Sequence, residues 1–147
     1  QIKIMTKKHI SKTSYGLLIF IFIIVFAPMV PVLMNGEFDN STTKSLTIAV
    51  LLFAFVLHIF LNTVYTIEDG ELKIRSGIIP YRPINISAIS EISKTKSLFS
   101  APAPSFDRIV VKYGQNRKMI VSPKDKVSFA KDLCAINPNI VNNITED

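Results

Sequence analysis

Residues 45–77 have the sequence SLTIAVLLFAFVLHIFLNTVYTIEDGELKIRSG, and the change of pattern within this stretch decides the fold. Between residues 46 and 61 nearly every side chain is apolar, which is typical of a helix that spans a bilayer. Across residues 64–76 apolar and polar side chains alternate around Gly70, which indicates a β-hairpin. Because no linker separates the two parts, the sequence predicts a folded domain held directly at a membrane surface.

A second apolar segment, residues 15–34, contains no charged side chain. A helix needs about 20 residues to cross the hydrocarbon core of a bilayer. Residues 15–34 and 45–64 are therefore predicted to form a transmembrane helical hairpin, and Pro28 and Pro31 should kink or end the first span. A cleaved signal peptide is the alternative for the first segment, but no small-residue cleavage site follows it.

The distribution of cations predicts the orientation of this hairpin. Lysines precede the first span and cations follow the second, whereas the loop between the spans holds only Lys44. The positive-inside rule then places both termini in the cytoplasm, with residues 1–14 as a basic leader. The cations that flank the two spans are Lys3, Lys7, Lys8, Lys12, Lys73, Arg75 and Arg82.

A single cysteine, Cys134, permits no intrachain disulfide, which fits a reducing compartment.

Residues 65–140 are predicted to form a mainly β (α+β) soluble domain. The hairpin at residues 64–76 opens it, and residues 106–114 (FDRIVVKYG) are predicted to form the clearest later strand. About six short strands are followed by one amphipathic helix. This order is that of a PH-like curled antiparallel sheet or barrel that one C-terminal helix closes. Residues 141–147 are expected to be a flexible tail.

The start of the predicted C-terminal helix is marked by residues 122–125. Ser122 is expected to cap the helix, with Pro123 in the first turn and Asp125 at the third position. An apolar stripe that includes Val127, Phe129 and Leu133 then follows at helical spacing.

Two motifs resemble those of bacterial PH-like domains of the YyaB-like family. They are residues 100–109 (SAPAPSFDRI), before a strand, and residues 120–126 (IVSPKDK), before the last helix. The resemblance covers roughly residues 64–140, and it implies a protein of the bacterial inner membrane, since members often carry two preceding spans. It also extends distantly to the immunity protein for the bacteriocin sublancin. The matching positions are Asp107, Arg108, Ser122, Pro123, Lys124 and Asp125.

The sequence contains few candidate catalytic residues. Both histidines, His9 and His58, lie outside residues 65–140, and Cys134 falls on the apolar stripe of the helix. No phosphate-binding glycine loop or metal-ligand spacing is present, so we expect no enzyme activity, cofactor or metal. The acidic loop at residues 68–71 argues against inositol phosphates there, and the scattered basic residues argue against nucleic acid.

The loop at residues 98–106 (LFSAPAPSF), before the clearest strand, is the candidate binding surface. Its apolar side chains and stiff prolines could form a docking surface at low entropic cost, or they could pack across the mouth of the barrel. We therefore expect a non-catalytic binding module anchored at the cytoplasmic face of the inner membrane. Its partners would be the lipid bilayer and another membrane protein or a peptide toxin, and bacteriocin immunity is the alternative function. The candidate contact residues are Leu98, Phe99, Pro102, Pro104, Phe106 and Arg108.

Overall fold

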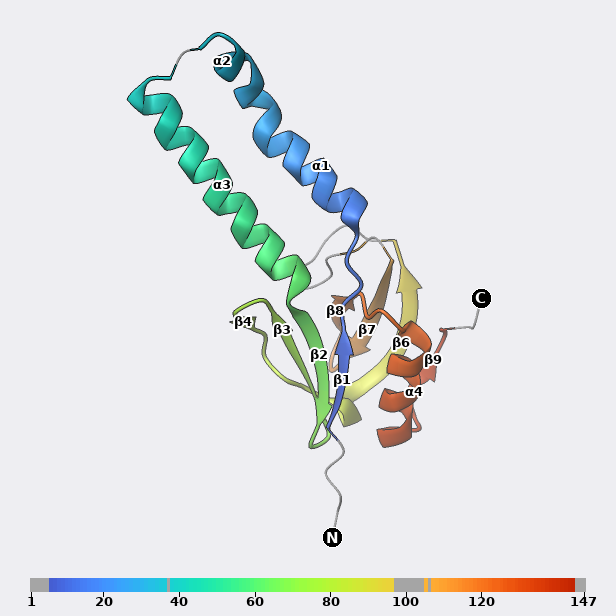
Figure 1. Cartoon of the computed structure of the whole chain (residues 1–147). Coiled ribbons are helices and arrows are strands. Elements are labelled where there is room, and N and C mark those ends of the chain that lie inside the picture. The colour runs from blue at the N-terminus through green and yellow to red at the C-terminus, as the bar shows by residue number, and fades with distance from the viewer. Residues whose placement is uncertain (1–5, 37, 97–104, 106, 145–147) are drawn as a thin grey trace.

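The computed structural model describes residues 6–36, 38–96, 105 and 107–144 of the chain. Figure 1 shows a helical hairpin whose two arms are joined to a small domain of strands and one helix. Both arms of the hairpin are long and apolar enough to cross a membrane, by length and composition. The first arm consists of α1 (Tyr15–Phe26), the 3-10 turn η1 (Ala27–Met29) and α2 (Val30–Met34), and the second arm is α3 (Asn40–Leu61).

Local sequence explains where the arms begin and change direction. Pro28 falls in the first turn of η1, and the chain leaves the α-helical geometry there, as the prolines predicted. Asp39 caps α3 because its carboxylate accepts a hydrogen bond from the backbone N–H of Thr42 at 2.7 Å. The second arm therefore starts at Asn40, earlier than the predicted residue 45, and ends at Leu61.

Two sheets build the domain. The first has the order β1 (Lys7–Ile10), β2 (Thr63–Glu68), β3 (Glu71–Ser76) and β4 (Ile79–Pro80), and β5 (Ile84–Asn85) also pairs with β3. The second has the order β8 (Arg117–Val121), β7 (Arg108–Tyr113), β6 (Ile89–Thr95) and β9 (Val141–Asn142), and the 3-10 turn η2 (Ile86–Ala88) precedes β6. The mainly β prediction is confirmed, but over the described residues the sheets do not close into a barrel.

The hairpin of β2 and β3 confirms the pattern at residues 64–76. Asp69 and Gly70 form its turn, with φ values of 53° and 74°. Two successive positive φ angles match the twist of the flanking strands, and glycine adopts such an angle without steric cost. The side chains of Ile67, Leu72 and Ile74 are buried on one face, as the alternation predicted.

Helix α4 (Lys126–Ile136) packs its predicted stripe into the core. Phe129, Ala130 and Leu133 are fully buried among the side chains of both sheets. The expected cap at Ser122 is wrong: Asp125 is the N-cap, and its carboxylate accepts from the N–H of Ser128 at 2.9 Å. Ser122 is instead occupied by contacts to the N-terminal segment, so the helix begins later.

Both ends of the chain contribute strands that the sequence did not predict. Within the expected leader, β1 pairs antiparallel with β2, from Lys7 opposite Ile67 to Ile10 opposite Val64. Figure 1 shows β1 running beside β2 before the chain enters α1. Within the expected flexible tail, β9 pairs in parallel with β6, and the side chain of Ile144 is buried.

Candidate functional site

Five of the six predicted contact residues, Leu98, Phe99, Pro102, Pro104 and Phe106, lie outside the described residues. The sixth, Arg108, is buried at the start of β7. Its Nε donates a hydrogen bond to the backbone carbonyl of Ser105 at 2.5 Å. Because its side chain is enclosed and bonded to this carbonyl, Arg108 holds the end of the loop and does not project from it.

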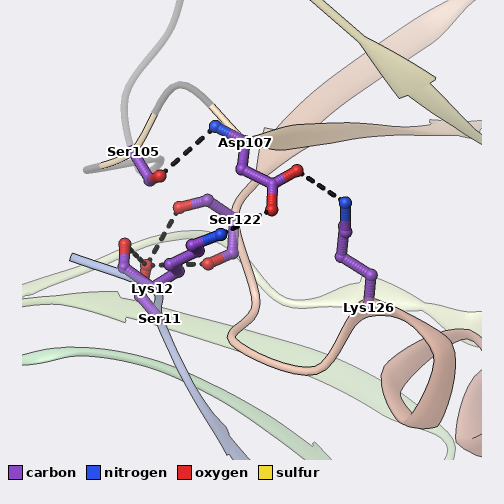
Figure 2. Close-up of polar contacts among 6 residues, drawn as sticks. All are labelled: Ser11, Lys12, Ser105, Asp107, Ser122 and Lys126. Atoms are coloured by element: carbon purple, nitrogen blue, oxygen red, sulfur yellow. Dashed lines mark hydrogen bonds and ion pairs between the residues drawn. The ribbon is translucent and has the colours of Figure 1, made fainter. Parts of the chain in front are cut away.

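Four of the six family-motif residues contact the N-terminal segment: Asp107, Ser122, Pro123 and Lys124. Figure 2 shows this junction, which we define as Ser11, Lys12, Ser105, Asp107, Ser122 and Lys126. The two carboxylate oxygens of Asp107 accept from different lysines: Oδ2 from Lys12 Nζ at 2.9 Å and Oδ1 from Lys126 Nζ at 2.5 Å. One carboxylate therefore links the segment before α1, the start of β7 and the start of α4.

Backbone hydrogen bonds reinforce the junction. The N–H of Lys12 donates to the carbonyl of Ser122 at 2.7 Å, and the N–H of Lys124 donates to the carbonyl of Ile10 at 2.9 Å. Ser11 also forms an isolated antiparallel bridge with Pro123. The N-terminal segment thus pairs with β2 on one side and meets the end of β8 on the other, which connects the two sheets at this corner.

The buried phenol of Tyr65 lies beneath these contacts. Its hydroxyl donates to Ser11 Oγ at 3.3 Å and accepts from the N–H of Ser122 at 3.0 Å. Burial raises the pKa of Tyr65, and the hydrogen bonds to Ser11 and Ser122 only partly oppose this. The phenol is therefore neutral at physiological pH and acts as a buried hydrogen-bonding group.

The charges of the junction do not favour proton transfer. Burial raises the pKa of Asp107, but hydrogen bonds and charges from Lys126 and Lys12 outweigh it and hold that pKa below its usual value. An ionised carboxylate between two ammonium groups is a poor general base. Elsewhere in the domain, burial raises the pKa of the Cys134 thiol, which disfavours the nucleophilic thiolate. The charged groups of the junction are therefore suited to holding its segments together.

A second cluster joins β1 to α4. His9 Nε2 lies 2.8 Å from Asp132 Oδ2, and Lys7 Nζ pairs with the other oxygen of the same carboxylate. The imidazole of His9 also meets the ring of Phe129 edge to face, with centroids 5.3 Å apart. The lysine and histidine of the expected leader therefore fix β1 against the helix.

Acid should weaken this second cluster. Burial raises the pKa of Asp132, but hydrogen bonds and charges from Lys7 and His9 outweigh it and hold that pKa below its usual value of 3.8. A pKa lowered by folding means that the carboxylate stabilises the protein fully above pH 3.8, and that this contribution is lost as the pH falls through the lower folded value. We expect Asp132→Asn to reduce the free energy of unfolding at pH 7 by about 1–3 kcal/mol and to flatten its decline in acid.

Denaturant unfolding of the full chain in detergent, followed across acidic and neutral pH, measures this effect. Asp69→Asn is the matched control, because Asp69 is exposed in a turn that suits asparagine equally well. Equal stability of the two variants at pH 7, with the same acid dependence, would show that the Asp132 cluster contributes nothing.

A lysine-lined hollow of about 620 Å³ opens beside the junction. It lies between β1, the end of β6 and the start of α4, where the carboxylate of Asp125 is engaged in capping. Lysines outnumber the one acid among the lining residues, and although Lys126 Nζ already pairs with Asp107 Oδ1, the hollow suits an acidic group of a partner. No local pattern in the sequence marks this hollow, because its lysines come from three distant segments: Lys8, Lys94, Lys124 and Lys126.

Comparison with known proteins agrees with the architecture. The family described as bacterial PH domain matches residues 63–137, just over half of the chain. No curated protein and no solved structure matches the sequence. The matched region begins with β2 and ends at the residue after α4, so β1 completes the first sheet from outside it. The chain belongs to the bacterial PH domain family.

Proposed function

We propose that this chain is a membrane-anchored, non-catalytic binding module at the cytoplasmic face of a bacterial inner membrane. The observation that carries the proposal is the double connection between hairpin and domain: β1 leads into α1, and α3 leads into β2. The N–H of Ser11 donates to the carbonyl of Thr63 at 3.0 Å, so the two feet of the hairpin are adjacent. A bilayer around the hairpin would then hold the domain against one leaflet.

Side chains of the segment that leads into α1 support this orientation. Lys7, Lys8 and Lys12 precede α1, and the positive-inside rule assigns such a segment to the cytoplasm. Tyr15, the first residue of α1, is 70% exposed, as expected of an aromatic side chain at the boundary between lipid and water.

The ligand that we propose is a membrane protein or a peptide that reaches the junction end of the domain. Two features support this choice. The lysine-lined hollow offers positive charge to an acidic partner. Ser105 and Asp107, which border the predicted contact residues in the sequence, lie at the junction, and Lys126 of the junction also lines that hollow. PH domains are binding modules, which agrees with a function that needs no chemical step.

Crosslinking in intact cells tests this proposal. A photoreactive amino acid at Phe99 should yield a discrete adduct with a protein or peptide. The same group at Gln115, an exposed position in the turn between β7 and β8, should yield none. Adducts with lipid alone from Phe99, or identical protein adducts from both positions, would contradict the proposal.

A narrower role is supported by the resemblance of residues 100–109 and 120–126 to the YyaB-like family. In this version the module protects its cell against a peptide bacteriocin by intercepting the toxin or shielding its target. Expression of the chain in a bacteriocin-sensitive strain should then raise survival. Unchanged killing, together with a protein adduct from Phe99, would support the binding module and contradict the immunity role.

A further inference from the structure

We infer that the turn after β3 together with β4, residues 77–80, is a second membrane contact that inserts Ile78 and Ile79 into the lipid beside the foot of α3. The inference rests on the proposed membrane anchoring and adds a point of contact to it. The occupant is the boundary between headgroups and acyl chains in the same leaflet. The domain would then be held at a fixed angle to the membrane by two contacts, the hairpin and this turn.

The turn is fastened to the end of the second span. The N–H of Gly77 donates to the carbonyl of Asn62, the residue after α3, at 3.2 Å. A Cβ on Gly77 would lie 3.1 Å from His58 Cδ2 and 3.3 Å from the Cα of Ile59. Glycine suits both this close approach and the φ of +61°, whereas a side chain would be strained and crowded there. The backbone of the turn therefore lies directly against the last turn of α3.

A buried contact adds to this connection. Thr63 Oγ1 and Ser76 Oγ are 3.1 Å apart, and both residues are buried. Asn62 Nδ2 lies 3.2 Å from Nδ1 of His58, so this histidine contacts the residue that follows α3. These polar groups mark the level at which the apolar surface of α3 ends.

The side chains at the tip of the turn are apolar and point away from the core. Ile78 is 71% exposed and Ile79 is 43% exposed, although the β3–β4 pairing needs neither of them to be apolar. Leu61, the last residue of α3, is 56% exposed at the same end of the domain. Figure 1 shows this turn at the end of the domain that faces the hairpin, beside the foot of α3. The exposed isoleucines therefore extend the apolar surface of the span.

Charged neighbours fit the same placement. Arg75 and Arg82 flank the turn and are exposed. An apolar tip between cations is the pattern of segments that lie in the interface, where the apolar side chains enter the acyl region and the cations meet phosphate groups. By contrast, the turn at Asp69 and Gly70 is acidic and lies at the far end of β2 and β3.

Single-tryptophan fluorescence tests this inference, since the chain contains no tryptophan. Ile78→Trp is placed in the full chain, which is reconstituted into phosphatidylcholine and phosphatidylglycerol vesicles whose acyl chains carry no bromine, bromine near the headgroups or bromine near the chain ends. Leu52→Trp in α3 is the control for a position inside the bilayer. Gln115→Trp is the control for water, because Gly114 bonds to Ala88 and Ile86 bonds to Gly70, which ties the β7–β8 turn to the far end of the domain.

The inference predicts that Ile78→Trp emits at shorter wavelength than Gln115→Trp and loses a large part of its fluorescence to brominated lipid. Ile79→Trp should behave in the same way, which guards against a distortion caused by one substitution. If both turn variants resist bromine as Gln115→Trp does while Leu52→Trp is quenched, the turn does not insert and the anchoring proposal stands. A blue-shifted but unquenched Ile78→Trp would indicate a protein contact and also overturn the inference. An unquenched Leu52→Trp would overturn the anchoring itself.

Discussion

A chain in which a short flexible linker replaces residues 14–61 should fold as a stable PH domain that needs no detergent, whereas residues 63–147 alone should not. The family match begins at residue 63, yet the structure places β1 inside the first sheet. The helical hairpin is in effect an insertion between two neighbouring antiparallel strands. Removal of the hairpin should therefore preserve the domain, and removal of β1 should disrupt it.

The physical reason lies in what β1 covers. Its four residues pair with β2, the carbonyl of Ile10 also accepts from the N–H of Lys124, and the N–H of Lys12 after the strand donates to the carbonyl of Ser122. At about 1 kcal/mol for each net hydrogen bond, the loss is on the order of 5 kcal/mol before any apolar surface is counted. Removal of β1 would also uncover Tyr65 and Phe129, which are fully buried. The total approaches the entire stability of a small domain, about 5–15 kcal/mol.

The linker variant is feasible because Ser11 and Thr63 are hydrogen-bonded neighbours. A turn of about four residues can join antiparallel strands at this separation. Thermal unfolding followed by circular dichroism measures the outcome for both chains. The matched control keeps the linker but scrambles residues 6–13, which preserves the length and charge of the segment and removes its register. Equal melting temperatures for the linker chain and for residues 63–147 would show that β1 is dispensable.

Phe129→Ala should lower the free energy of unfolding by about 3–5 kcal/mol, the usual range for a large aromatic side chain in a core. Phe129 is fully buried in α4, and its ring lies 5.3 Å from that of His9 and 5.9 Å from that of Tyr65. This one side chain therefore joins α4, β1 and β2. Truncation leaves a cavity at the point where the helix covers the sheets.

Urea unfolding of the full chain in detergent measures this prediction. Ile136→Ala is the control on the same helix, because Ile136 is 48% exposed and should change stability by about 1 kcal/mol or less. If the two substitutions destabilise equally, α4 does not close the domain through Phe129. A selective loss at Phe129 with far-ultraviolet circular dichroism unchanged would match the structure.

Elements with strong local periodicity were predictable from the sequence. The hairpin around Gly70 and the stripe with Phe129 and Leu133 are confirmed, because alternation and helical spacing are properties of short segments. Strand β1 was missed because KKHI has no apolar alternation. Its pairing depends on the edge of β2 and on Asp132, which lie far away in the chain.

The candidate site was harder to predict for the same reason. The sequence singled out Asp107 as a family-motif residue, but nothing local shows that Lys12 and Lys126 share its carboxylate. The expected helix start at Ser122 was wrong because that residue pairs with the N-terminal segment instead. Both differences have one cause: the segment before α1 packs at the corner between the two sheets, against residues that are distant in the sequence.

Cysteine accessibility in intact cells tests the central claim, that the hairpin crosses the membrane twice and holds the domain inside. In a Cys134→Ser background, Ser41→Cys lies at the start of α3 and Gln115→Cys lies in the domain, and both positions are exposed. A membrane-impermeant maleimide should label Ser41→Cys in intact cells and Gln115→Cys only after lysis. Labelling of Gln115→Cys in intact cells, or recovery of the full chain in the soluble fraction, would contradict the account.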